Sequence, residues 1–321
     1  MTKILSIGAA VQDVFLSHSD EFKPVSDVGH HELFLQLELG AKADVNKIDF
    51  STGGGATNAA VTFARQGLQA IFMGTIGHDP AGNAVLQDLD NEGVDTRYVS
   101  YSETLNTGYS VLLLAPNGER TILTYRGAST HYDRQNFNLD GIEADWLYVS
   151  SMAGSFDVLD AIFHQAKDAG MKVFFNPGKG ELAQPDKLKS LLDDVDVLSV
   201  NRDEAAQIVE GVDSEELARH LLHYVGTAIV SDGPNGVVAT DGTHIVSAGM
   251  YEDVPVIDRT GAGDAFGSGF LSQWAQGKSL KDAIIFASAN STSVVTKIGA
   301  KVGILSQHTV LHDMPLEEKE Y

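Results

Sequence analysis

The 321-residue sequence predicts an α/β fold in which helices cover both faces of a mainly parallel central sheet. Short apolar runs rich in β-branched residues alternate with stretches of helical periodicity for most of the length. Such alternation is typical of parallel strands joined by helices. Several helical stretches are also followed by glycine, the residue that most often ends a helix: Gly67, Gly93, Gly170, Gly211 and Gly277.

Six runs have the composition of buried strands, because they are short, mainly apolar and bounded by turn residues. They are 3–9, 70–76, 146–150, 172–176, 195–200 and 227–231. Apolar residues at helical spacing predict the helices between and after them: 57–66, 81–92, 156–169, 204–210, 214–224, 264–276 and 280–297.

Two stretches depart from this rhythm. Residues 32–50 and 107–127 alternate apolar and polar side chains, and the second contains a Pro-Asn-Gly turn at 116–118. Alternation predicts strands with one buried and one solvated face. Two interpretations stand nearly level: a small sheet that stands off the main body as a lid or dimer contact, or an antiparallel extension of the main sheet. The acidic C-terminal sequence LEEKEY is expected to be a frayed tail.

The balance of charge argues against some partners. The sequence has 44 Asp and Glu against 22 Lys and Arg, a formal net charge of −22, which repels nucleic acid and acidic membrane surfaces. An anionic ligand must therefore be held by local devices such as backbone N–H groups, a helix N-terminus or a divalent cation. Cysteine is absent, and the sequence shows neither a signal peptide nor a long apolar run. We expect a cytoplasmic protein that binds neither nucleic acid nor membranes.

Polar residues follow the ends of the predicted core strands. Ligands of open parallel sheets bind beyond the carboxyl ends of the strands, so these residues are expected to meet at one edge. Each alone can be an ordinary turn residue, but five such groups favour a functional edge. In chain order they are Asp13, Asn176, Asn201 with Glu204, Ser231 to Gly233, and the sequence DRTGAGD.

The sequence DRTGAGDAF (258–266) joins a strand end to a helix. Gly261, Ala262 and Gly263 are expected at or just before the helix N-terminus, where backbone N–H groups lack partners and the helix dipole attracts anions. A transferring phosphoryl group requires such donors. Asp264 can accept the proton of an attacking hydroxyl, and we expect its pKa to be low. The alternative is that Asp264 is only the N-cap of the helix after a glycine turn.

A second glycine cluster, STGGGATNAAVTFARQG (51–67), follows an alternating strand and opens another helix. Glycines at 53–55 would let a ligand touch the backbone, and Asn58 offers a donor and an acceptor to neighbouring hydroxyls. The alternative is a tight turn followed by an asparagine N-cap.

With both clusters present, the sequence resembles the ribokinase-like (PfkB) carbohydrate kinase family. The resemblance covers nearly the whole chain and runs in order through ILSIGAAVQDVF, GGGATNAA, GTIGHDPAG, VLSVNRDEA, VSDGPNG, DRTGAGDAF and TKIGAKVGI. It implies a ribokinase-like three-layer sandwich, a single domain over 1–321, with a small β-sheet lid formed by about 14–50 and 105–127. It also implies transfer of the γ-phosphoryl group of ATP, with Mg²⁺, to a hydroxyl of a sugar or nucleoside. A homodimer formed through the lid is a candidate assembly.

The resemblance assigns roles to individual residues. Asp264 is the catalytic base, and Gly261, Ala262 and Gly263 form the anion hole. Asp13, Gly54 and Asn58 bind the substrate, and Arg126 on the lid is a candidate for the transferring phosphate, with a solvated strand arginine as the favoured alternative. Asn201 and Glu204 organise phosphate and a water-mediated Mg²⁺, while Ser231, Gly233 and Gly236 line the nucleotide site. Asp258 and Thr260 match positions that bind a monovalent cation, usually K⁺, in some members.

Three departures from the family pattern limit what the resemblance implies, and the substrate stays open. Gly55 stands where ribokinases often have lysine, and PGKGEL after Asn176 lacks the arginine expected of a ketodeoxygluconate kinase. Gly303 replaces a serine that assists the cation site of ribokinases, which argues against activation by K⁺.

Four functions therefore compete. A sugar kinase acting on ribose, a ketose or a similar furanose leads, and a nucleoside kinase of the same fold is the close rival. A non-catalytic sugar- or nucleotide-binding protein is the alternative from another class, and a dinucleotide dehydrogenase is weakened by the lack of GxGxxG. The histidines, including His30–His31 and the pair His220 and His223, do not form a metal-binding pattern.

Overall fold

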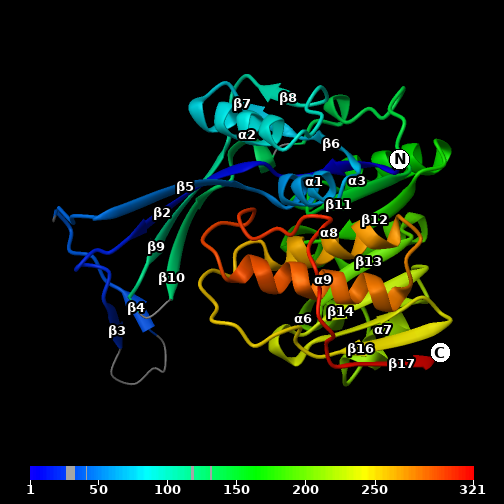
Figure 1. The fold of residues 1–321 in the computed structure, drawn as a ribbon. Helices are drawn as coiled ribbons and strands as arrows, with labels where there is room; N and C mark the ends of the chain where they lie inside the picture. Colours follow the sequence, from blue (N-terminus) through cyan, green and yellow to red (C-terminus); the bar gives the residue numbers. More distant parts are fainter. Residues whose placement is uncertain (27–32, 41, 117–118, 131) are drawn as a thin grey trace.

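The computed structural model describes residues 1–321 except 27–32, 41, 117–118 and 131. His30 and His31, and two residues of the Pro-Asn-Gly turn, lie outside the described residues. The chain forms an α/β body from which a second sheet projects (Figure 1). No helix in the described part of the chain is both long enough and apolar enough to cross a bilayer.

The central sheet has nine strands, and all six predicted core strands are among them. In spatial order the first six are β6 (Gln69–Met73), β1 (Lys3–Ile7), β11 (Trp146–Ser150), β12 (Lys172–Asn176), β13 (Val197–Asn201) and β14 (Thr227–Ser231). Neighbours within this set are parallel, which confirms the predicted sheet. The sheet continues with three antiparallel strands that were not predicted, β15 (Val237–Thr240), β16 (His244–Ala248) and β17 (Leu316–Glu320).

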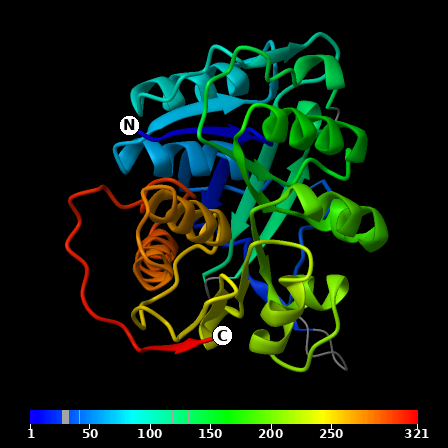
Figure 2. The ribbon, with the colours of Figure 1, turned by 90° about the vertical axis from the view of Figure 1, so that its right-hand side faces the viewer.

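Helices cover both faces of this sheet, as predicted. Alternate strand residues point to opposite faces, so Leu5 and Ile7 belong to one apolar core and Ile4 belongs to the other. The first core is covered by α3 (Phe156–Asp168), α5 (Pro185–Leu191), α6 (Arg202–Ile208) and α7 (Ser214–Leu221). The second is covered by α1 (Gly55–Arg65), α2 (Pro80–Asn91), α8 (Ala262–Trp274) and α9 (Leu280–Val295). Figure 2 shows α8 and α9 packed side by side, with α1 next to them.

The sequence analysis missed the seven-residue α5 and the single-turn α4 (Lys179–Leu182), which lie between two predicted strands. Two short strands, β7 (Thr75–Gly77) and β8 (Ser100–Ser102), pair outside the main sheet.

The second sheet is separate from the first. Its strands, in order, are β10 (Arg120–Tyr125), β9 (Gly108–Leu114), β2 (Val11–Ser17) and β5 (Lys47–Gly53). The interpretation of the alternating stretches as an edge extension of the main sheet is therefore wrong. Residues 36–46 contain no strand where they are described. Before them, β3 (Pro24–Ser26) and β4 (Leu33–Leu35) pair with each other in a small sheet of their own.

The two faces of the second sheet differ. Asp13 pairs in register with Ser51 on one side and Ser110 on the other, so these three side chains share a face. The opposite face carries apolar side chains that the described chain leaves uncovered: Ile48, Phe50, Leu123 and Tyr125 are 53%, 62%, 58% and 48% exposed.

The C-terminal sequence LEEKEY is not a frayed tail. Its first five residues form β17, which pairs with β16 and closes the edge of the central sheet. Lys319 donates to Glu215 of α7 at 2.7 Å, and the guanidinium of Arg219 lies over the ring of Tyr321. High charge on an edge strand is compatible with pairing because its side chains lie in solvent.

We expect the backbone amides of β17 to exchange hydrogen more slowly than those of the preceding loop, 306–315, because the strand amides are paired with β16. Hydrogen–deuterium exchange followed by mass spectrometry resolves the two segments. Equally fast exchange in both would show that the terminus frays, as the sequence alone suggested.

Candidate active site

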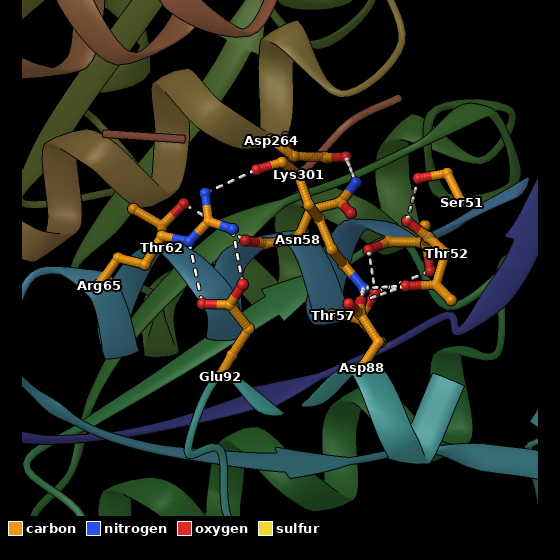
Figure 3. A network of polar contacts seen from close by, with 12 residues as sticks. Ser51, Thr52, Thr57, Asn58, Thr62, Arg65, Asp88, Glu92, Asp264 and Lys301 are labelled. Carbon is orange, nitrogen blue, oxygen red and sulfur yellow. Dashed lines mark hydrogen bonds and ion pairs between the residues drawn. The ribbon is translucent and has the colours of Figure 1, made fainter. Parts of the chain in front are cut away.

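The two glycine clusters of the sequence meet where α1 and α8 lie against each other. Asn58 on α1 and Asp264 on α8 point toward one another in Figure 3. Three side-chain hydrogen bonds join the helices: Asn58 Nδ2 donates to Asp264 Oδ2 at 2.8 Å, Ser268 Oγ to Thr62 Oγ1 at 2.8 Å, and Gln273 Nε2 to Gln66 Oε1 at 3.1 Å. The spacing of four or five residues along each helix places all three bonds along one seam.

Asp264 is the third residue of α8 and does not cap it. The cap is Gly261, whose φ of 77° lies in the left-handed region that favours glycine. A Cβ at this position would lie 2.4 Å from Ala300 Cβ, so no larger residue fits. The interpretation of Asp264 as a plain N-cap is therefore wrong.

The first amides of α8 are open to a ligand. Among the described residues, the backbone N–H groups of Gly263 and Asp264 have no hydrogen-bond acceptor. The backbone N–H of Ala262 donates to the carbonyl oxygen of Arg259. Gly263 is exposed, and no atom lies within 4 Å of the position its Cβ would take. Of the predicted anion hole, the Ala262 N–H is therefore already bonded, and Gly263 together with Asp264 offers the free N–H groups of a helix N-terminus.

The expectation of a low pKa for Asp264 is wrong. Burial raises the pKa of this carboxyl above 3.8, and the hydrogen bond from Asn58 offsets only part of the effect. Desolvation therefore outweighs the helix terminus and the amide donor.

The glycines of the first cluster let the backbone pass between two carboxylates. A Cβ on Gly53 would lie 2.4 Å from Asp13 Oδ2, and one on Gly55 would lie 3.1 Å from Asp264 Oδ1. Gly54 has a φ of 104°, and a Cβ there would lie 2.2 Å from a backbone carbonyl. The structure thus brings together Asp13, Gly54, Asn58 and Asp264, as the sequence analysis expected.

Among the buried oxygens of this region that have no protein partner within the described residues are Asn58 Oδ1 and Ser150 Oγ. The residues are 2% and 5% exposed. An unsatisfied buried polar atom costs about 1–3 kcal/mol, so a ligand or water is expected beside them. Ser150 was missed by the sequence analysis, although it ends a predicted buried strand at the functional edge.

Asp13 lies on β2 and is 4% exposed. Burial raises the pKa of its carboxyl, while a hydrogen bond with Ser110 and the charge of Lys301 lower it. Asp258 adds a further upward effect, which shows that two buried carboxylates lie close enough to repel.

Lys301 is itself 5% exposed and belongs to the network in Figure 3. Its Nζ donates to Thr52 Oγ1 at 2.6 Å and to Asp88 Oδ2 at 2.9 Å. Burial lowers the pKa of Lys301, and the nearby Asp88 carboxylate offsets part of this effect. This lysine joins the second sheet to α2 directly behind Asp13.

A cavity of about 440 Å³ begins at the N-terminus of α8, where Ala262 and Gly263 line it. The nucleotide-binding candidates Ser231, Gly233 and Gly236 line the same cavity. The sequence analysis missed the other walls, which come from the loop 249–256 and from α9: they include Met250, Val254, Val256, Ser291 and Val295, together with Phe266 of α8 and Arg259. The apolar share of these walls suits a flat ring, and the helix terminus suits an anion.

Asn201 and Glu204 lie together but bond to each other. Asn201 Oδ1 accepts from the Glu204 amide at 2.9 Å, and Glu204 Oε2 accepts from the Asn201 amide at 2.9 Å, a capping box for α6. Asn201 stands opposite Ser231 in register, so the pair lies at the edge of the cavity that Ser231 lines. Burial raises the pKa of Glu204, against the hydrogen bonds from Asn201.

The remaining candidates are placed differently. Asp258 is 2% exposed and is bonded to Thr260. Arg126 is exposed and directly follows β10. Its charge acts on Tyr132: burial and the charge of Glu181 raise the pKa of this tyrosine, and the charge of Arg126 opposes them. No three His, Cys, Asp or Glu side chains converge as metal ligands in the part of the chain that the structure describes.

Comparison with known proteins agrees with this geometry. A family model described as pfkB family carbohydrate kinase matches residues 1–307. The chain is 29% identical to a ribokinase from Haemophilus influenzae, over 81% of this chain and 86% of that protein. It is 30% identical to an ATP-dependent ribose-1-phosphate kinase from Halopiger xanaduensis, over 82% and 87%. The fold matches a ribokinase from Cryptococcus neoformans solved in complex with ADP, with a TM-score of 0.74, 23% identity and coverage of 96% and 98%.

We expect Asp264→Asn to raise the free energy of unfolding at pH 7. Because folding raises the pKa of Asp264, ionisation destabilises the folded chain above that raised pKa, and the penalty is gone once the pH falls below 3.8. The gain from asparagine should therefore be largest at neutral pH. Denaturant unfolding at several pH values measures it.

Asp88→Asn is the matched control with the opposite sign. Burial raises the pKa of Asp88, but Lys301 and Thr52 together bring it below 3.8, so its ionised form stabilises the folded chain above this pH. We expect this variant to lose about 2 kcal/mol at pH 7, because Lys301 is left without its partner. Destabilisation of similar size in both variants would contradict the assignment for Asp264.

Proposed function

The chain belongs to the pfkB family of carbohydrate kinases, and from this membership we propose that it moves the γ-phosphoryl group of ATP to a hydroxyl of a small sugar in the cytoplasm. One observation carries the proposal: the open amides at the start of α8 face the end of a cavity, and the Asp264 carboxylate stands beside them. An acceptor hydroxyl held between the amides and the carboxylate would contact both the phosphoryl group bound at the amides and the base that takes its proton.

The reaction then follows from this placement. The nucleotide occupies the cavity with its terminal phosphate at Gly263 and Asp264, whose N–H groups stabilise the charge that spreads over the phosphoryl oxygens. The acceptor oxygen bonds to the γ-phosphorus, the bond to the β-phosphate oxygen breaks and ADP leaves. The hydroxyl proton passes to Asp264. A raised pKa makes this carboxylate a better proton acceptor, provided that it stays ionised at the working pH.

Hydroxyl groups of the acceptor fit the polar atoms that the chain leaves open. Asn58 Oδ1 and Ser150 Oγ can accept from them, and the ionised Asp13 carboxylate can accept from a further pair. The backbone at Gly54 allows the ring to approach closely. Such a set recognises a polyhydroxylated ring, whether it is a free sugar or the ribose of a nucleoside.

Mg²⁺ fits the edge of the cavity through water. One oxygen of Glu204 bonds to Asn201, and the other is available to a water molecule of the ion. When bound, Mg²⁺ would neutralise charge on the nucleotide phosphates. The second sheet, with the segments about 14–50 and 105–127, would act as the lid of a single domain over 1–321, and Arg126 at its root would reach the phosphate from the lid side.

We expect Asp264→Ala and Asp264→Asn to lower kcat by about 10²–10⁴-fold, because the base is lost, while the affinity for Mg·ATP changes little. ADP formation is followed by a coupled assay with ribose, fructose, ribose 1-phosphate, ketodeoxygluconate, adenosine, inosine and cytidine. Asp140→Asn, an exposed carboxylate elsewhere, is the control.

Chelation of the divalent cation should abolish turnover in the same assay. Full activity in both Asp264 variants would remove the base, and ATP binding without turnover on any acceptor would favour a binding protein. Turnover on nucleosides alone would decide for the rival kinase.

The uncovered apolar face of the second sheet fits a second copy of this chain. Ile48, Phe50, Leu123 and Tyr125 lie on strands β5 and β10, at the two open edges of the sheet. Faces of this kind mark protein interfaces. We expect light scattering to show a dimer. In Phe50→Glu the dissociation constant of the dimer should rise by about tenfold or more. Val212→Glu, at an apolar residue elsewhere that is even more exposed, should leave the assembly unchanged, and a monomeric wild type would contradict the proposal.

A further inference from the structure

The geometry points to Arg120 as the resident cation of the turn before α8, in the place where the family resemblance implies a monovalent ion. Phosphoryl transfer by this chain then depends on a guanidinium delivered by the second sheet and not on K⁺. This inference rests on the proposed function. Arg120 acts as a positioning residue, through Asp258 and the turn that carries the anion hole.

Both oxygens of the Asp258 carboxylate accept hydrogen bonds from the chain. Its Oδ1 accepts from the backbone N–H of Thr260 at 3.0 Å and from the Thr260 hydroxyl at 2.7 Å. Its Oδ2 accepts from the backbone N–H of Gly299 at 3.1 Å. The bonds tie together the two loops, 258–261 and 299–303, that meet at Gly261 and Ala300.

These residues do not fit a monovalent cation. Such an ion is held by a shell of oxygen atoms that replaces its water. Here both Asp258 oxygens already accept from N–H or O–H donors of the chain, and the Thr260 hydroxyl is one of those donors. At Gly303 no side chain can add a ligand, because a Cβ there would lie 2.5 Å from the carbonyl oxygen of Ser293.

A buried carboxylate still requires a compensating charge. Asp258 is 2% exposed, and an unpaired charge at such depth is strongly destabilising. Asp13 lies near enough to add repulsion. Within the described chain, the one ion pair made by Asp258 is with Arg120, whose Nε lies 3.9 Å from Oδ1.

Arg120 is placed for this role by the register of the second sheet. Thr124 pairs with Ser110, which pairs with Asp13, and Arg120 lies four residues before Thr124 on the same face. Its side chain is 24% exposed, and its Nε is buried and lacks a hydrogen-bond partner in the described structure. A guanidinium is charged at every physiological pH and keeps its donors in a fixed plane, so it can replace a bound ion permanently.

The consequence is a link between the second sheet and the anion hole. Arg120 on β10 forms an ion pair with Asp258, and Asp258 accepts a hydrogen bond from Thr260. The residue after Thr260 is Gly261, the cap of α8. Loss of the charge should let this turn shift. Misplacement of catalytic donors by about 1 Å can lower a rate by about 100-fold.

Turnover with Mg·ATP is measured for the wild type in the chlorides of K⁺, Na⁺, Li⁺ and tetramethylammonium at equal ionic strength, with the melting temperature recorded in each salt. We expect equal rates. Arg120→Gln should lose about 100-fold in kcat, with a smaller change in KM, and dissolved guanidinium should restore part of the rate while tetramethylammonium does not. Arg120→Lys should retain more activity than Arg120→Gln. Arg97→Gln, which removes an exposed arginine paired with Asp95, is the control.

Severalfold stimulation of the wild type by K⁺ over tetramethylammonium would overturn the inference while leaving the kinase assignment intact. Wild-type activity in Arg120→Gln would also overturn it. If no acceptor gives turnover, the proposed function fails instead, and a crystal soaked in Rb⁺ still decides the cation question. Anomalous density beside Asp258 would refute the role of Arg120, and a guanidinium in direct contact with Asp258 without such density would support it.

Discussion

The structure depends on the seam between α1 and α8. Asn58 and Asp264 are 206 residues apart in the chain, yet one hydrogen bond of 2.8 Å joins them. The same seam is held by Thr62 with Ser268. Because each helix begins at a glycine cluster, fixing the two helices also fixes the position of the two clusters relative to each other. The hydrogen bond that orients the carboxylate also leaves the other oxygen of Asn58 free for a ligand.

Negative charge is the second constraint. The chain carries a formal net charge of −22, and three carboxylates, Asp13, Asp258 and Asp264, lie around the site that we propose for the polyanionic nucleotide. Favourable contacts therefore have to be local. The open amides of α8, the buried Lys301 and the guanidinium of Arg120 supply them at short range, where screening by salt is weak.

Much of this could be predicted from the sequence, because the main signals are local. Apolar runs and helical periodicity identified the parallel strands and the long helices, and the two glycine clusters marked the N-terminal ends of α1 and α8. Properties that depend on distant packing could not be predicted. The pKa of Asp264 is set by burial, the pairing of β17 by the free edge of β16, and the pairing of Arg120 with Asp258 by the register of a sheet whose separation from the main one was undecided.

A crystal structure with Mg²⁺, a non-hydrolysable ATP analogue and the preferred acceptor tests the central claim most directly. The account predicts the terminal phosphate at the N–H groups of Gly263 and Asp264, and an acceptor hydroxyl within hydrogen-bonding distance, about 3 Å, of the Asp264 carboxylate. A nucleotide bound at the opposite edge of the central sheet, or a carboxylate turned away from the acceptor, would contradict it.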